Sequence, residues 1–199
     1  MSLTCAMLTQ MAFVAAQTPQ DVALCSFVVA TNIGSIYPEW VCDSSNQPSS
    51  DLCTWSGISC TNNNVDVMSL NEAGFNGSVP SELGQLSAIS KLDLAKNSLT
   101  SSIPSELSQL SALTLMHLYS NDLTGTIPPE LGQLSVLRNM KLSSNSLAGT
   151  IPAEFGQLST LQTLWLRQNS LTGSLPSTLG QMASLSNLNL ASNFLTGTL

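Results

Sequence analysis

The chain is short of charge, of aromatic residues and of long apolar runs. Only 9% of its 199 residues are charged and 5% are aromatic, and five Lys and Arg stand against twelve Asp and Glu, for a formal net charge of −7. This acidic balance disfavours nucleic acid as a partner and keeps the chain soluble. No run of 18 apolar residues occurs, so no transmembrane helix is predicted.

Residues that carry catalysis are scarce as well. His117 is the one histidine, and the sequence shows no Ser/Asp arrangement to partner it and no cluster of metal-ligating side chains. The glycines follow a repeat period and form no phosphate-binding loop. We therefore expect no enzymatic activity and no metal or other cofactor.

A 24-residue pattern fills most of the chain. It restarts at Leu110, Leu134, Leu158 and Met182, and its first full copy reads Leu86-x-x-Ile89-x-x-Leu92-x-Leu94-x-x-Asn97-x-Leu99. The pattern L-x-x-L-x-L-x-x-N with a period of 20 to 29 residues is the signature of leucine-rich repeats. The segment 123–134, Leu-Thr-Gly-Thr-Ile-Pro-Pro-Glu-Leu-Gly-Gln-Leu, resembles the plant-specific subclass found in receptor-kinase ectodomains and polygalacturonase-inhibiting proteins.

The resemblance implies an α/β solenoid, a right-handed leucine-rich-repeat superhelix. Apolar and polar residues alternate in 116–118, as they do in a strand, and stacked repeats place such strands about 4.8 Å apart in a parallel sheet on the concave face. Short 3-10 or helical turns should lie on the convex face, each starting with Pro and carrying Glu at its third position. Six repeats are predicted: 62–85, 86–109, 110–133, 134–157, 158–181 and an incomplete 182–199.

Two columns of the repeat have a structural explanation. Buried asparagine amides should satisfy backbone groups where the chain leaves each strand, and the column comprises Asn97, Asn121, Asn145, Asn169 and Asn193. The first repeat has Ala73 in this place, so its turn must be closed in another way. A glutamate column at the convex turns is expected to be structural, not catalytic: Glu82, Glu106, Glu130 and Glu154.

The N-terminal region predicts export. Residues 1–16 carry no charged side chain and end in small residues, with Val14 and Ala16 placed for cleavage, so the segment resembles a secretory signal peptide. An amphipathic helix, or a chain whose true start is missing, is the alternative. At the other end Leu199 falls inside the sixth repeat, which predicts either a longer protein or a partner that covers this edge.

Four cysteines remain once Cys5 is removed with residues 1–16, and all four precede the repeats. An even set in one region is typical of a disulfide-stapled cap, here residues 17–61, with three possible pairings; a zinc site is the alternative. The segment 53–60, Cys-Thr-Trp-Ser-Gly-Ile-Ser-Cys, is similar to the plant-type N-terminal cap. That resemblance implies the pairs Cys53–Cys60 and Cys25–Cys42.

Asn76-Gly77-Ser78 is the one N-glycosylation sequon. It lies on the second-strand flank of the first repeat, where a glycan would block that flank. The chain is therefore expected to be a glycoprotein at Asn76.

Outward-facing strand positions carry the variation that can bind a ligand. Aromatic residues and Arg dominate binding hot spots, and the third to fifth repeats place several such residues side by side. All five Lys and Arg also fall on or beside the predicted concave strands, which favours an anionic ligand. The predicted ligand-binding residues are His117, Tyr119, Arg138, Lys141, Trp165 and Arg167.

We therefore expect a secreted or ectodomain-type, non-catalytic module that binds a peptide or protein, with an acidic glycan or a secreted enzyme as further candidate partners. The alternative is an ice- or surface-binding protein. Thr and Ser form a regular ladder on the predicted second strand, and its spacing of about 4.8 Å could approach an ice repeat. The ladder pairs are Thr124/Thr126, Ala148/Thr150, Thr172/Ser174 and Thr196/Thr198.

Overall fold

The computed structural model of the chain describes residues 18–31, 37–45 and 47–197. The predicted signal peptide, residues 1–16, lies outside the described residues. Thr198 of the predicted ladder and the chain end at Leu199 do as well.

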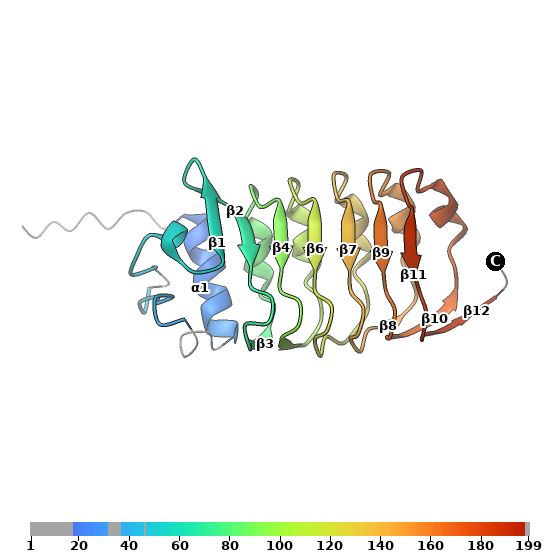
Figure 1. The fold of residues 1–199 in the computed structure, drawn as a ribbon, viewed down its shortest axis with the longest axis horizontal. Helices are drawn as coiled ribbons and strands as arrows, with labels where there is room; N and C mark the ends of the chain where they lie inside the picture. Colours follow the sequence, from blue (N-terminus) through green and yellow to red (C-terminus); the bar gives the residue numbers. More distant parts are fainter. Residues whose placement is uncertain (1–17, 32–36, 46, 198–199) are drawn as a thin grey trace, which may run out of the picture.

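The chain forms the predicted solenoid (Figure 1). A seven-stranded sheet has the order β1-β2-β4-β6-β7-β9-β11, and every pair is parallel except β1 with β2. Partners in adjacent parallel strands are 24 residues apart, as in Leu92 with Met116, so each repeat forms one rung of the solenoid. The strands are β1 (Ile58–Thr61), β2 (Asn64–Ser69), β4 (Lys91–Asp93), β6 (Leu115–His117), β7 (Asn139–Lys141), β9 (Thr163–Trp165) and β11 (Asn187–Asn189).

A second set of short strands runs along one edge of the solenoid, seen at the lower side of Figure 1. It forms a two-stranded sheet, β3-β5, and a three-stranded sheet, β12-β10-β8, both parallel. Isolated bridges, Ser102 with Thr124 and Thr126 with Ala148, link the rungs between them. The strands are β3 (Asn76–Ser78), β5 (Ser98–Thr100), β8 (Ala148–Gly149), β10 (Ser170–Ser174) and β12 (Phe194–Thr196).

The other side of each rung is a five-residue 3-10 turn, behind the sheet in Figure 1. The proline of the repeat precedes the turn in an extended conformation and is not its first residue, as the sequence had predicted: Pro80 has ψ 148° and its carbonyl accepts from the N–H of Leu83 at 3.2 Å. Proline suits this place because its fixed φ fits both conformations. The turns are η3 (Ser81–Gln85), η4 (Ser105–Gln109), η5 (Pro129–Gln133), η6 (Ala153–Gln157) and η7 (Ser177–Gln181).

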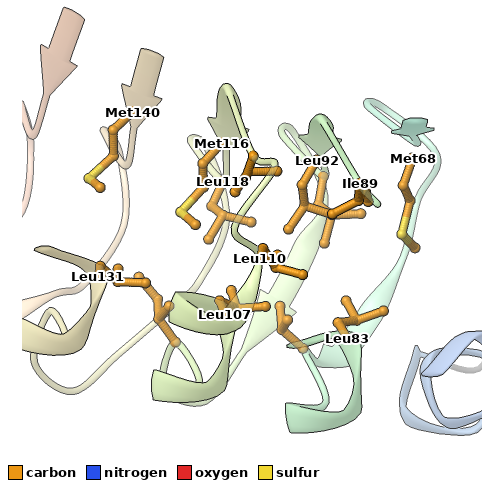
Figure 2. Close-up of a cluster of buried hydrophobic side chains, with 14 of the residues drawn as sticks. Met68, Leu83, Ile89, Leu92, Leu107, Leu110, Met116, Leu118, Leu131 and Met140 are labelled. Atoms are coloured by element: carbon orange, nitrogen blue, oxygen red, sulfur yellow. The ribbon is translucent and has the colours of Figure 1, made fainter. Parts of the chain in front are cut away.

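Leucine, isoleucine and methionine side chains from both layers fill the space between sheet and turns (Figure 2). Met116 and Met140 point down from neighbouring strands, and Leu107 and Leu131 point up from the turns beneath them, all with no exposed surface. Each rung contributes only a slice of this core, so adjacent rungs bury each other's apolar faces.

The asparagine column is structural, as predicted. Asn121 accepts from the Leu99 N–H at 3.0 Å and donates to the carbonyls of Leu94 and Leu118 at 3.0 and 3.1 Å. The first rung, which has Ala73 in this column, is closed by the asparagine of the next rung, because Asn97 accepts from the N–H groups of Ala73 and Phe75. A single side chain therefore satisfies backbone groups of two rungs at once.

The N-terminal end of the sheet is covered by a cap of α1 (Pro19–Thr31), η2 (Leu52–Thr54) and β1. The disulfide pairs implied by the resemblance, Cys25–Cys42 and Cys53–Cys60, are confirmed, and they use the four cysteines that a zinc site would need. Trp40 stacks on Trp55 with ring centroids 4.8 Å apart, and both rings are buried. The cap thus closes the first rung with aromatic side chains and two covalent links.

Helix α1 packs closely against β3 at Gly77. A Cβ added there would lie 1.9 Å from the carbonyl oxygen of Ala30, and Gly77 has φ +87°. Only glycine fits this position, which also forms the middle of the sequon at Asn76. The side chain of Asn76 is exposed beside this contact.

Candidate ligand-binding surface

The sheet presents one outward side chain per rung at its centre. Register pairs Asp93 with His117, His117 with Lys141, Lys141 with Trp165, and Trp165 with Asn189. Side chains of paired residues on one face of a sheet are neighbours. The residues that sequence analysis placed side by side in the third to fifth rungs therefore do lie on one continuous strip of the concave face.

Trp165 is the exposed aromatic residue of this strip. Its side chain keeps 39% of its surface in solvent, although its strand neighbours Leu164 and Leu166 are buried. The ammonium group of Lys141 lies 4.1 Å from the centre of the Trp165 ring, a cation–π contact of about 0.5–1 kcal/mol at an exposed site. The contact orients both side chains on the concave face.

The basic residues fall into two groups. Lys96 forms an ion pair with Glu72, and the hydrogen bond from this carboxylate, together with its charge, raises the pKa of Lys96. Lys91 lies 4.0 Å from an Asp93 carboxylate oxygen and donates to Ser69. Within residues 18–31, 37–45 and 47–197, Arg138, Lys141 and Arg167 make no salt bridge. Uncompensated positive charge is therefore concentrated on the fourth and fifth rungs, around Trp165.

The predicted binding residues do not all lie in the same environment. Lys141 and Trp165 lie on β7 and β9; Arg138 is exposed immediately before β7, and Arg167 is exposed two residues after Trp165. Tyr119 and His117 are half-buried on the third rung, with ring centroids 5.8 Å apart in an edge-on arrangement. The strip thus has an open cationic part and a more enclosed part at His117.

Asp93 and Asn139 belong to the enclosed part, and sequence analysis did not include them in the site. His117 Nδ1 lies 3.6 Å from Asp93 Oδ2, and His117 Nε2 lies 3.2 Å from Asn139 Oδ1. Both residues hold strand positions next to His117, so the repeat register was the signal that could have identified them.

The carboxylate of Asp93 is almost completely buried, with 8% of the residue exposed. Burial alone would raise the pKa of Asp93, but hydrogen bonds from His117 and the Ala95 N–H, with the nearby positive charges of His117 and Lys91, lower it below its usual value. Asp93 is therefore a carboxylate at neutral pH, held by its own protein.

The convex face has a different chemistry. Glu82, Glu106, Glu130 and Glu154 lie in the first turns of η3 to η6, away from the sheet. In the part of the chain that the structure describes, no three His, Cys, Asp or Glu side chains are grouped so as to hold a metal ion. The described residues also include no helix long and apolar enough to cross a membrane.

The Thr/Ser ladder occupies the edge strands. Its described Thr and Ser members are exposed, and neighbouring rungs approach closely, since a Cβ at Gly149 would lie 2.9 Å from the Thr126 methyl group. Bridge partners are 22 residues apart, as in Thr126 with Ala148 and Ser174 with Thr196, so the ladder is staggered by two residues per rung. Phe194, paired with Thr172 and 68% exposed, interrupts the row at its C-terminal end.

Models of the leucine rich repeat family match residues 88–110, 112–134 and 135–195. A chain of the BIR3–SERK2 complex from Arabidopsis thaliana is 30% identical, with a TM-score of 0.73 over 87% of this chain and 94% of that chain. The chain belongs to the leucine-rich-repeat family. Its fold and its relatives place it among plant-type extracellular leucine-rich-repeat proteins.

Other solved leucine-rich-repeat structures are longer than this chain. The HAESA ectodomain from Arabidopsis, in complex with an N-terminally extended IDA peptide hormone ligand, is 30% identical with a TM-score of 0.75 over 89% of this chain and 29% of that chain. A plant ice-binding protein is 29% identical with a TM-score of 0.77 over 89% of this chain and 56% of that chain. A curated relative, Protein MALE DISCOVERER 1 of Arabidopsis thaliana, is 37% identical over 49 residues, which are 25% of this chain and 7% of that protein.

Proposed function

We propose that this leucine-rich-repeat protein is a non-catalytic extracellular binding module whose concave face takes an extended peptide or protein segment carrying carboxylates. The observation that carries the proposal is the exposed Trp165 ring beside Lys141, with Arg138 and Arg167 uncompensated nearby, in a chain of net charge −7. Negative charge elsewhere on the molecule repels an anionic ligand, so local positive charge directs it to this strip.

The relatives support a peptide or protein ligand. HAESA was solved with a peptide hormone, and BIR3 with SERK2 as a complex of two proteins. The two disulfides suit an oxidising, extracellular compartment. A receptor-ectodomain role and an inhibitor role towards a secreted enzyme both use such a surface, and an acidic glycan offers the same carboxylate chemistry as an acidic peptide.

A binding comparison of two matched truncations tests the proposal. Trp165 and Val136 are equally exposed, at 39% each, but Val136 lies outside the strip. Against a panel of synthetic octapeptides with acidic, amide-substituted and basic sequences, Trp165→Ala should weaken acidic-peptide binding by about 2 kcal/mol, or about thirtyfold. Val136→Ala should bind as the parent does. Equal affinities of the parent and Trp165→Ala, with both folded, would contradict the proposal.

Ice binding is the second candidate function, favoured by the exposed Thr/Ser ladder and by the likeness to a plant ice-binding protein. Thermal hysteresis of the parent protein tests it directly. Thr126→Lys with Thr150→Lys should abolish hysteresis if the ladder binds ice, whereas the same change at exposed Ser135 and Ser159 should not. Absence of hysteresis in the parent protein would exclude this candidate.

A further inference from the structure

The His117 ring lies between two oxygen atoms from neighbouring strands. Asp93 Oδ2 on β4 is 3.6 Å from Nδ1, and Asn139 Oδ1 on β7 is 3.2 Å from Nε2. Only 12% of the His117 side chain and 11% of the Asp93 side chain are exposed. The ring therefore bridges three adjacent strands of the concave sheet, with little water to replace either contact.

This geometry fits one protonation state better than the other. A neutral imidazole has one N–H group and one lone pair, whereas an imidazolium has two N–H groups. Only the imidazolium can donate to both oxygens. A neutral ring that donates to Asp93 would turn its Nε2 lone pair towards Asn139, and the Asn139 amide would then rotate to present its NH₂ group. The His117 proton and the orientation of the Asn139 amide are therefore linked.

The charged groups that face His117 act in opposite directions. From β4, Asp93 favours the imidazolium, and Lys91, 4.0 Å from the same carboxylate, offsets part of that effect. From β7, the register partner Lys141 opposes it; from β6 itself, Tyr119 contributes only the edge of its ring. The pKa of Asp93 lies below its usual value, so Asp93 keeps its charge over the range, about pH 5 to 8, in which imidazole ordinarily titrates.

We propose that His117 is a pH-responsive bridge in the concave face: when protonated it ties Asp93 to Asn139 and adds a positive charge beside Lys141. An anionic ligand should then bind more tightly at acidic pH, by about two- to fivefold, the range of a partly exposed ion pair. This consequence for binding rests on the proposed function, while the bridge itself does not.

Nuclear magnetic resonance of the whole chain tests the bridge without any ligand. The chain has one histidine, so its ring signals are unambiguous. Between about pH 5 and 8, the His117 ring signals and the Asn139 side-chain amide signals should change together. Asp93→Asn should move the midpoint to lower pH, and Asn139→Asp, which places a second carboxylate at the ring, should move it to higher pH. A His117 ring that does not titrate, or an Asn139 amide that does not follow it, would overturn the proposal.

A dye-labelled octa-aspartate peptide tests the consequence for binding. With a pH-insensitive dye and at low ionic strength, where charge effects are least screened, the parent should bind the peptide about two- to fivefold more tightly at about pH 5.5 than at about pH 8. His117→Gln should remove this ratio and keep the affinity of the parent at the higher pH. An unchanged ratio in His117→Gln would overturn the pH coupling. If the parent does not bind the peptide at either pH while the coupled resonance changes persist, the anionic ligand of the proposed function fails and the bridge is upheld.

Discussion

The concave surface has an N-terminal half, on β2, β4 and β6, and a C-terminal half, on β7, β9 and β11, which share one backbone and differ in how their charges are used. In the N-terminal half Lys96 is paired with Glu72, and Lys91 with the buried Asp93. In the C-terminal half Lys141 contacts the face of Trp165, and within the described residues Arg167 meets no carboxylate. Equal numbers of cations along a repeat therefore do not mean equal attraction for an anion, because register partners decide which charges remain free.

The largest expected effect tests whether the two halves share one scaffold. Asn121 and Asn145 hold the same place in different halves and make the same set of backbone hydrogen bonds. Replacing either with Ala leaves buried backbone groups unpaired and should lower the free energy of unfolding by about 1–3 kcal/mol. Urea denaturation measures the loss.

Asn187→Ala is the matched control for these two variants, since Asn187 is exposed on β11. Its denaturation midpoint should stay close to that of the parent. A loss at Asn145 much smaller than at Asn121 would mean that the scaffold, and not only its outward charges, differs between the halves.

A second test separates free from paired cations. At about 0.15 M salt, where the Debye length is about 8 Å, only charges close to a ligand affect its affinity. Arg167→Gln should weaken binding of the octa-aspartate peptide by about two- to fivefold, and Lys96→Gln should have less effect, because Glu72 already holds that ammonium group. Affinities from fluorescence anisotropy decide between them. Equal losses in the two variants would remove the distinction between the halves.

The smallest expected effect concerns acid stability. The pKa of Asp93 is lowered in the folded protein, so its carboxylate contributes stability above the unfolded value of about 3.9, and that contribution is lost as the pH falls through the lowered folded pKa. Asp93→Asn should therefore be less stable than the parent at neutral pH, and the difference should shrink below about pH 4. Thermal melts across this range provide the measurement.

Asp122→Asn is the control for the acid series, because Asp122 is exposed and lies outside the concave strip. Its melting temperature should follow that of the parent at each pH. If the difference between Asp93→Asn and the parent stays constant from neutral pH to pH 3, the Asp93 carboxylate is not the group that responds to acid.

The repeat pattern predicted most of the fold because inward positions are fixed by burial. Leu92, Met116 and Leu164 recur at a constant interval, and each has no exposed surface in the structure. The disulfide pairs followed from the resemblance of the cap segment. The position of the repeat proline was wrong by one residue, because φ near −65° fits both the end of a strand and the first turn of a helix.

The details of the candidate site could not be predicted in the same way. That Lys141 contacts Trp165 depends on the rotamers of two long side chains, which register alone does not determine. The ion pair of Lys96 with Glu72 joins turns of adjacent rungs, where both residues have positive φ. Asn139 resembles any exposed strand residue in the sequence, and only its distance of 3.2 Å from His117 gives it a place in the site.

The constant 24-residue register makes the sheet a ruler with evenly spaced marks. His117 and Trp165 stand on strands separated by one strand, β7, so about two strand spacings, or about 9.6 Å, separate them. Duplication of one complete repeat between them would lengthen that separation by one mark and leave every other pairing intact. A leucine-rich-repeat protein can therefore change the length of segment it measures without redesigning either anchor.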